Sequence, residues 1–582
     1  MKGKWFAFGC LTSVIIVILM FVSAFFSINS LSKISHEPNR AKLSDNSTLH
    51  FKLVGDIVEY NEFKDDIFSS PFMPKTNAAY DIIDKIKMAK YDPKIKSILI
   101  EPRWISTGYA TLHEIGLAIN DFKQSGKPVY AYLEMNADKD YLLASYADEI
   151  YLNPSASAGI MLSGVGGTRL FYKDFFEKLG IEMTVLHAGQ YKGAGENYYR
   201  NGYSEPVKEN LSLLYNELFD KILLTISENR NIPYDDVKYI FEERDDIFIK
   251  KNKAIEYKLV DGLEFKENLI NRIVQSKDQL VSASKYKVKK KFKENQPKIA
   301  TLYLQGQISP QTTEYQANVL SAQKVSEAIN DIMKDDNIKG VVVRINSPGG
   351  SALESEIIHS KLKKLRDKMP VVISMSNVAA SGGYYISTPS DYVYADPFTI
   401  TGSIGVVAMF PNLSDLKDKV GLSTDSISKG KYANALNIYQ KPDKAFLESF
   451  KNGINETYIE FKTRVSEGRK ISLEDVEKVA QGQVWFSTSA LKNNLVDELG
   501  TIESSQEKVA SLANLDEYVT ESYPKQVSFF EELVMEKLQV AAKNNLTPDL
   551  VKNLELQKQF DTILRIKNDP IQMLLPYFEI AR

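Results

Sequence analysis

A serine flanked by small residues follows an apolar run in the second half of this 582-residue chain. Ser381 stands between Ala380 and Gly382, and residues 371–374 before it have the composition of a buried strand. At a strand-to-helix turn of this kind, the serine hydroxyl can be exposed in a cleft, with the next backbone amide directed at the same point. Serine is also a favoured helix N-cap, so this position taken alone fits either a nucleophile or a cap.

A glycine pair stands at a comparable turn upstream. Residues 341–345 form another strand-like run, which leads into Pro348-Gly349-Gly350. Glycines let the backbone turn there with its amides exposed at the start of a helix, where they can stabilise an anion or a developing oxyanion. No Gly-Lys-Ser/Thr follows, so a nucleotide-binding loop is not predicted.

A serine hydroxyl is a weak nucleophile until a base takes its proton. All five histidines precede Ser381; we expect His359 on a solvated helix face, and His187 remains a rival base. A lysine can serve instead if burial lowers its pKa from about 10.4 toward neutrality. The chain is rich in lysine, so composition does not select one.

Two parts of the chain repeat each other. Residues 338–343 echo residues 95–100, and residues 391–397 echo residues 148–154, both with a shift of 243 (338 − 95 and 391 − 148). β-branched runs alternate with helical patterns in each half, which predicts an α/β fold with a largely parallel sheet. The predicted units are an anchor (1–30), a first repeat (45–275), a charged linker (276–298), a second repeat (299–520) and a C-terminal helical extension (521–582).

The N-terminus predicts a membrane anchor. Residues 5–28 carry no charge, and these 24 residues cover roughly 36 Å as a helix, enough for a ~30 Å hydrocarbon core. A cleaved signal peptide with small residues at 22–24 is the alternative, although its apolar core would be about 7–15 residues. Lys2 and Lys4 favour an N-terminus inside and a body outside the membrane.

Composition excludes several function classes. A formal charge of −3 gives no basic stripe for nucleic acid. The only cysteine, Cys10, lies in the apolar N-terminal run, so the body can form no disulfide. With five histidines and one cysteine, no metal site is predicted.

Three motifs in order, at 346–350, 380–384 and 401–406, resemble the peptidase domain of the signal peptide peptidase A (protease IV) family, peptidase family S49. The duplication and the anchor resemble its long bacterial form, over roughly residues 50 to 520. The resemblance implies tandem Clp/crotonase-like domains behind an N-terminal transmembrane helix. It further implies a serine endopeptidase without cofactor or metal, and a homo-oligomer (a tetramer) on the outer face of the bacterial inner membrane. Peptides such as signal-peptide remnants would be its substrates.

The resemblance also implies roles for individual residues. It makes Ser381 the nucleophile and Lys192, within Gly189-Gln190-Tyr191-Lys192, the base. It places an oxyanion hole at the amides of Gly350 and Gly382, and it gives Ser403 a supporting role beside the lysine.

The internal repeat supports this split dyad. A shift of 243 places Asp138 opposite Ser381, and aligning residues 189–192 with 430–433 places Ala433 opposite Lys192. Each half has therefore kept one member of the dyad, and the first half is not expected to be a second active site. Lys431 is the runner-up base. Two rival classes remain, a crotonase-type acyl-CoA enzyme and an inactive membrane scaffold.

Overall fold

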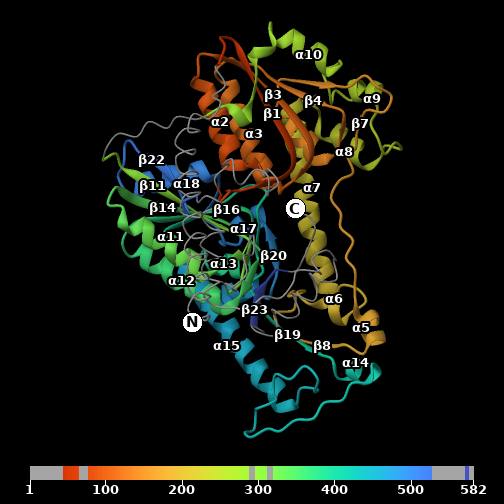
Figure 1. Cartoon of the computed structure of the whole chain (residues 1–582), viewed down its shortest axis with the longest axis vertical. Coiled ribbons are helices and arrows are strands. Elements are labelled where there is room, and N and C mark those ends of the chain that lie inside the picture. The colour runs from red at the N-terminus through yellow and green to blue at the C-terminus, as the bar shows by residue number, and fades with distance from the viewer. Residues whose placement is uncertain (1–42, 64–76, 288–294, 311–318, 527–570, 576–582) are drawn as a thin grey trace, which may run out of the picture.

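The computed structural model describes residues 43–63, 77–287, 295–310, 319–526 and 571–575. The predicted anchor at residues 1–30 lies outside these ranges. Among the residues described, no helix is long and apolar enough to cross a bilayer. The described chain is mixed α/β, as the sequence predicts, and its described residues form three large sheets (Figure 1).

The first half is built on a parallel sheet with the strand path β10-β1-β3-β4-β6-β9, and β2 pairs with β1. Ile98 and Leu99 at its centre are fully buried, since helices cover both faces of a parallel sheet. The strands are β1 (Ser47–Val58), β2 (Asn77–Ala78), β3 (Ile95–Ser106), β4 (Val129–Leu133), β6 (Glu149–Leu152), β9 (Gly262–Leu263) and β10 (Leu280–Ser282), with a separate pair β5 (Met135–Asn136) and β7 (Gly159–Ile160).

The long α7 reaches the second half, where Asn210 bonds the backbone of Val484. Most helices of the first half pack around this sheet, whereas those at 173–179 and 196–199 contact each other and the strand at 182–188 or its neighbours. The helices are α2 (Ala79–Tyr91), α3 (Tyr109–Lys123), α4 (Asp138–Ala144), α5 (Lys173–Leu179), α6 (Glu196–Tyr199), α7 (Glu205–Arg230), α8 (Tyr234–Glu242), α9 (Lys251–Glu256) and α10 (Lys266–Ile273), with short 3-10 turns at Lys277–Gln279 and Ala283–Lys285.

The second half repeats the first. Its sheet contains the parallel path β22-β11-β14-β16-β17-β21, which matches the path of the first sheet strand for strand; β18 and β20 extend it beyond β16. Val341 and Val343 of β14 face one apolar cluster and Val342 faces another with Val509, as alternation along a strand requires. The strands are β11 (Lys298–Gln305), β14 (Ile338–Ser347), β16 (Val371–Ala380), β17 (Tyr392–Ala395), β18 (Ile400–Gly402), β20 (Val484–Phe486), β21 (Glu498–Leu499) and β22 (Val519–Tyr523).

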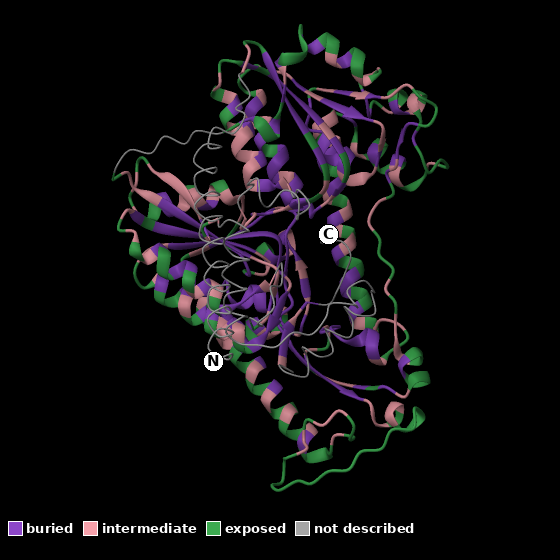
Figure 2. Cartoon of the chain, viewed as in Figure 1, coloured by how far each residue is buried: buried purple, intermediate pink, exposed green. Residues whose placement is uncertain are grey.

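The helices of the second half follow the same alternation, and the strands they surround are largely buried (Figure 2). They are α11 (Ala322–Lys334), α12 (Ala352–Arg366), α13 (Gly382–Tyr385), α14 (Ser414–Lys419), α15 (Lys444–Arg469), α16 (Leu473–Val479), α17 (Ser487–Lys492) and α18 (Ile502–Leu512).

A third sheet joins the two halves, with the order β13-β12-β15-β23-β19-β8. Its strand β8 comes from the first half and pairs antiparallel with β19 of the second, from Ala188 opposite Val406 to Glu182 opposite Asn412. The strands are β8 (Glu182–Ala188), β12 (Gln307–Ile308), β13 (Val319–Leu320), β15 (Gly349–Ser351), β19 (Val406–Asn412) and β23 (Ile571–Leu574).

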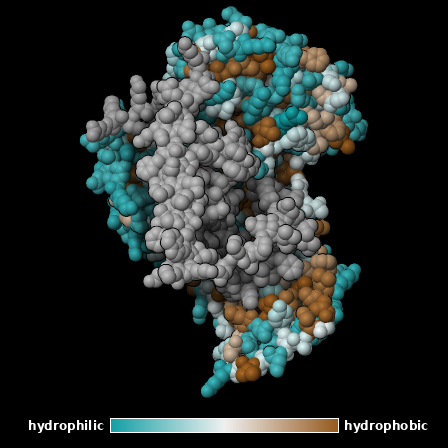
Figure 3. Space-filling model, viewed as in Figure 1, coloured by the Kyte–Doolittle hydropathy of each residue, from teal (hydrophilic) through white to brown (hydrophobic). Residues whose placement is uncertain are grey.

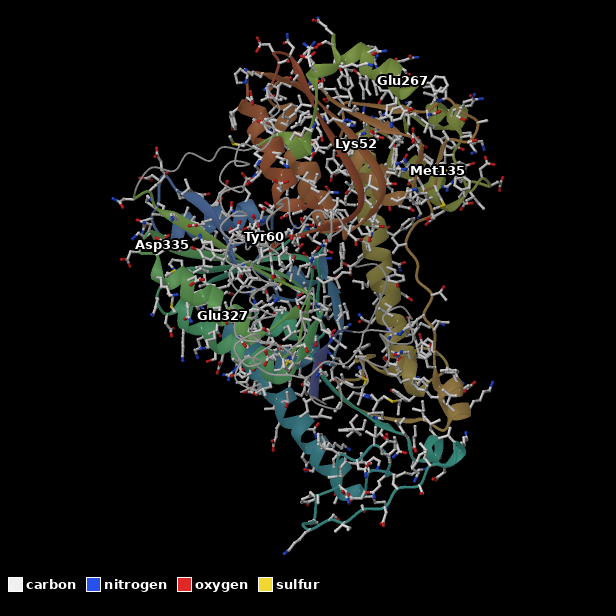
Figure 4. The ribbon with its side chains drawn as sticks, viewed as in Figure 1. Lys52, Tyr60, Met135, Glu267, Glu327 and Asp335 are labelled. Atoms are coloured by element: carbon white, nitrogen blue, oxygen red, sulfur yellow. The ribbon has the colours of Figure 1, made fainter. Side chains whose placement is uncertain are left out.

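A buried polar cluster also fixes the halves to each other. Arg344 of β14 is 1% exposed, and its guanidinium lies 2.9 Å from Glu59 and 2.7 Å from Glu114 of the first half. Nearby, Tyr60 stacks on Tyr303 with ring centroids 4.6 Å apart, and Figure 4 shows Tyr60 where the halves meet. A shift between the halves would leave these buried charges unpaired, which is costly.

Two predicted boundaries change. The linker assigned to 276–298 begins too early, because β10 within it pairs with β1 and completes the first sheet. Its lysine-rich part at 288–294 lies outside the described residues. The extension assigned to 521–582 begins inside β22, and its other described part, β23, is a strand rather than a helix. Most of the predicted helical extension, at 527–570 and 576–582, lies outside the described residues.

Candidate active site

Ser381 stands at the end of β16 and directly before α13, at the turn that the sequence indicated. Its backbone has φ 56° and ψ −118°, a strained conformation for a residue with a Cβ. The Ser381 amide donates to the Gly402 carbonyl at 2.8 Å, which secures the turn against β18. The side chain is fully buried.

Lys192 reaches this serine from the first half. It lies in the turn that follows β8, and the pairing of β8 with β19 brings that turn beside Ser381. The Lys192 Nζ is 2.7 Å from the Ser381 Oγ, a hydrogen-bond distance. The structure therefore places the two predicted dyad residues in contact within one chain.

The surroundings of Lys192 favour its neutral form. The side chain is 2% exposed, and burial lowers its pKa well below the usual value. No carboxylate contributes to the pKa of Lys192, so nothing offsets the loss of hydration. The lowered pKa favours the neutral amine, which can accept a proton from a hydroxyl at 2.7 Å.

Ser403 holds the lysine amine from the other side. The Nζ lies 2.8 Å from the Ser403 carbonyl oxygen and 3.0 Å from its Oγ. Ser403 has φ 52°, and its amide donates to the Gln483 carbonyl at 2.7 Å. The structure thus brings Ser403 to the dyad, where its two oxygens and the Ser381 Oγ surround the amine.

The two glycines assigned to the oxyanion hole are also neighbours. A Cβ built on Gly382 would lie 3.3 Å from the Gly350 nitrogen, and a Cβ on Gly349 would lie 2.6 Å from the Gly382 nitrogen. The amides of Gly350 and Gly382 are therefore close to each other and to the nucleophile. Two neighbouring N–H groups beside the nucleophile are suited to stabilising the oxyanion of a tetrahedral intermediate.

The sequence did not predict Gly482, which packs against the turn that contains Lys192. A Cβ on Gly482 would lie 2.7 Å from the Lys192 backbone, and the Gly482 φ of 78° also favours glycine. The Tyr191 amide donates to the Gln481 carbonyl at 2.9 Å. Gly482 follows Lys192 by almost half the chain, so only the fold connects them; the one local signal is the isolated glycine itself.

The rival bases lie elsewhere. His187 is an exposed residue of β8 opposite Val407, and Lys431 is exposed with its Nζ 5.1 Å from the Tyr432 ring. The prediction that His359 is solvated was wrong: it is 5% exposed and packs edge-on against Tyr385. Among the described residues, no hydrogen bond or ion pair joins His359 to Ser381 or Lys192; its neighbours are Glu356 and Tyr385. Asp138, opposite Ser381 in the repeat, accepts hydrogen bonds from the amide and hydroxyl of Ser163.

Comparisons with known proteins show which family this chain resembles. The model of a family described as peptidase family S49 matches residues 121–281 and 363–516, one segment in each half. The chain is 33% identical to Protease 4 of Haemophilus influenzae over 76% of this chain and 74% of that protein. It is 32% identical to Protease 4 of Salmonella typhi over 77% of this chain and 74% of that protein.

Two further similarities are more limited. A chloroplastic serine protease SPPA of Arabidopsis thaliana is 31% identical over 73% of this chain and 64% of its own length. A solved ClpP1 variant of Listeria monocytogenes matches 35% of this chain and 93% of its own at 16% identity, with a TM-score of 0.24.

Proposed function

We propose that this chain cuts peptide bonds with Ser381 as nucleophile and Lys192 as general base. The chain belongs to peptidase family S49 and is therefore a serine protease. The observation that carries this proposal is the 2.7 Å contact between the Lys192 Nζ and the Ser381 Oγ in a fully buried setting. Ser403 acts as a positioning residue, because its oxygens hold the amine toward the serine.

In the first step, neutral Lys192 takes the hydroxyl proton as the Ser381 Oγ attacks the carbonyl carbon of the substrate. The amides of Gly350 and Gly382 stabilise the oxyanion that develops. The Lys192 ammonium then returns the proton to the leaving amine as the C–N bond breaks. The first product departs and leaves an acyl ester on Ser381.

In the second step, Lys192 takes a proton from water, which attacks the ester carbonyl. The same amides stabilise the second oxyanion. Collapse of this intermediate returns the proton to the Ser381 Oγ and releases a carboxylic acid. The dyad is regenerated, and one water molecule is consumed for each peptide bond cut.

The substrates we propose are signal-peptide remnants at the membrane. The support is the uncharged run at residues 5–28, which fits a single anchor, together with the family resemblance of the catalytic motifs. We place the catalytic body on the outer side of a bacterial inner membrane, because Lys2 and Lys4 precede the run.

A homo-oligomer is part of the same proposal. Exposed apolar side chains gather where α5 and α14 meet, and they include Phe175, Leu179 and Leu422. Figure 3 shows hydrophobic surface in this lower part of the molecule. Apolar patches of this kind fit contact with another subunit or with a bilayer.

The test uses the full chain in detergent with a fluorogenic peptide and a synthetic signal peptide. We expect the wild type to cleave both peptides. The Ser381→Ala variant, which lacks only the hydroxyl, should cleave neither peptide. Cleavage of the fluorogenic peptide without the signal peptide would overturn the substrate proposal and leave the catalytic one. If Ser381→Ala cleaves as fast as the wild type, the nucleophile is wrong.

A further inference from the structure

The strand β16 contains a bulge shortly before it reaches the nucleophile. Its pairing with β14 is regular up to Ile345 opposite Met375 and resumes at Ser347 opposite Ala379. Between those two pairs lie one residue of β14 and three residues of β16, at 376–378. Bulges bend a strand and redirect the side chains that follow, and they are common beside active sites. The shape of this bulge therefore sets the direction in which β16 presents the nucleophile.

The side chains of the bulge bind the first half of the chain. The Asn377 Oδ1 accepts a hydrogen bond from the Thr111 amide at 3.1 Å, and the Asn377 Nδ2 donates to the Thr111 Oγ1 at 2.7 Å. The Ser376 Oγ donates to the Glu59 Oε1 at 2.5 Å. Asn377 is 6% exposed and Ser376 is fully buried. Loss of the partners in the first half would thus leave buried polar groups of the bulge unsatisfied, which is costly.

Asn377 also caps the helix that contains Thr111. Helix α3 begins after Gly108, which has no side chain to accept a hydrogen bond from the free amides of the first turn. Thr111 is the third residue of the helix, and its amide is one of the two that an N-cap side chain binds. A Cβ built on Gly108 would lie 2.1 Å from the Cγ and the Oδ1 of Asn377. The place of a cap side chain is therefore filled from the second half, at the boundary that α3 and β16 form in Figure 1.

The second half contains the same helix with a cap of its own. A shift of 243 places Gly108 opposite Ser351 (351 − 108). The same shift places Thr111 opposite Glu354 (354 − 111). The Ser351 Oγ caps α12 by accepting from the Glu354 amide at 3.2 Å. Gly108 has φ −78° and ψ 163°, which any residue can adopt, so its conformation does not require glycine. The space that Asn377 fills does require it.

The backbone at the nucleophile needs support of this kind. The positive φ of Ser381 is a strained conformation, which persists only where the surrounding structure over-determines it. Within the second half, the Ser381 amide donates to the Gly402 carbonyl at 2.8 Å, and the Val378 amide donates to the Asn346 Oδ1 at 3.2 Å. Asn377 adds the support from the first half, four residues before the nucleophile.

We propose that Asn377 is a positioning residue for peptide cleavage: as the N-cap of α3 supplied from the other half, it fixes the bulge of β16 and so holds Ser381 toward Lys192. This inference rests on the proposed function and adds a residue to it. The hydrogen bonds of the Asn377 side chain go to Thr111 rather than to the dyad, so Asn377 acts through the backbone that leads to the nucleophile.

The test moves the cap from one half to the other in the full chain. Asn377→Ala removes the link between the halves and leaves α3 without a cap. Asn377→Ala combined with Gly108→Ser gives α3 the cap that the second half uses, in the space that the asparagine has left, but does not restore the link. Cleavage of a fluorogenic peptide gives kcat and KM, and thermal unfolding followed by circular dichroism gives Tm.

We expect the two variants to differ in stability but not in rate. In Asn377→Ala, kcat should fall about 10- to 100-fold while KM stays within about threefold, because the reacting groups are misplaced and no substrate contact is removed. Its Tm should fall as well, because α3 loses its cap and buried groups lose their partners. The double variant should regain much of the Tm and keep the low kcat.

Asn136→Ala is the matched control. Asn136 is 2% exposed, and its side chain donates to the Pro102 carbonyl at 2.7 Å and accepts from the Glu134 amide at 2.7 Å. These bonds stay within the first half. The Asn136→Ala variant should therefore lower the Tm while its kcat stays within about twofold of the wild type.

The outcomes separate this inference from the proposed function. A wild type that cleaves no peptide overturns the proposed function and this inference with it. An active wild type with equal kcat in Asn377→Ala overturns the inference alone. Recovery of kcat in the double variant would show that Asn377 acts only through the stability of α3, and an equal loss of kcat in Asn136→Ala would show that any destabilisation lowers the rate. Either result overturns the positioning role. If Asn377→Ala fails to fold, the kcat of the folded double variant decides.

Discussion

Lys192 and Ser381 are separated by 189 residues in the sequence, yet the lysine Nζ lies 2.7 Å from the serine Oγ. The pairing of β8 with β19 produces this contact, because it carries the lysine turn of the first repeat into the second. The site exists only when both halves are correctly placed, so its function depends on the interface as well as on the two side chains.

Replacing the buried lysine by an apolar side chain should not destabilise the protein at neutral pH. The folded pKa of Lys192 is below the unfolded value of about 10.4, so the unfolded state binds more protons between the two values. The resulting decrease in the free energy of unfolding is largest below the folded pKa and disappears above about pH 10.4. For Lys192→Met we expect an equal or higher Tm at pH 7, with the difference shrinking toward high pH. A large drop in Tm at pH 7 would contradict a neutral buried amine.

The rate of peptide cleavage should rise with pH through the lowered pKa of Lys192. Only the neutral amine can act as base, so kcat/KM should increase about tenfold per pH unit below that pKa and level off above it. The midpoint should lie well below about 10.4, the value for a solvated lysine. Initial rates with a fluorogenic peptide across the stable pH range measure this profile. A midpoint near the solvated value would mean that the base is exposed.

The glycine beneath the lysine turn should be required for activity. Gly482→Ala would bring a Cβ to 2.7 Å from the Lys192 backbone, so we expect displacement of the turn and a loss of activity of about 100-fold or more. Gly421 is a matched control, with φ 75° against 78° for Gly482 but open space around its Cβ position. Gly421→Ala therefore carries the same backbone strain without the clash. Equal activity losses in the two variants would show that strain alone explains the effect.

The arginine between the halves should be important for stability. Arg344→Met would leave the carboxylates of Glu59 and Glu114 buried without their cation, at a cost of about 3–5 kcal/mol. Arg366→Met removes a more exposed ion pair with Asp391 and should cost at most about 1 kcal/mol. Urea unfolding monitored by circular dichroism compares the two. Similar losses in both variants would contradict the role of the buried cluster.

The sequence indicated the candidate catalytic residues better than the residues and strands that hold them in place. Ser381 and the glycine turn are visible because strands and turns leave local patterns, whereas Lys192 was selected by the family resemblance and supported by the repeat. Gly482 and β23 could not be predicted this way, because their contacts depend on where the folded chain returns. His359 shows the same limit: its charged neighbours in sequence predicted exposure, but tertiary packing against Tyr385 buries it.

The predicted start of the linker at residue 276 was too early for a related reason. The strand β10 is three residues long and lies next to a lysine-rich segment, so its composition resembles a linker. It belongs to the first sheet only through its pairing with β1, a partner more than two hundred residues away. Short edge strands carry too little periodicity for their pairing to be predicted.

The split dyad is tested most directly by peptide cleavage with Ser381→Ala, Lys192→Met and an equimolar mixture of the two. Lys431→Met, at an exposed lysine away from the dyad, serves as the control. We predict that each dyad variant loses at least about 1,000-fold in kcat/KM, that Lys431→Met cuts like the wild type, and that the mixture stays inactive because both residues must share one chain. Wild-type cleavage by folded Lys192→Met, or recovery of activity in the mixture, would contradict this account.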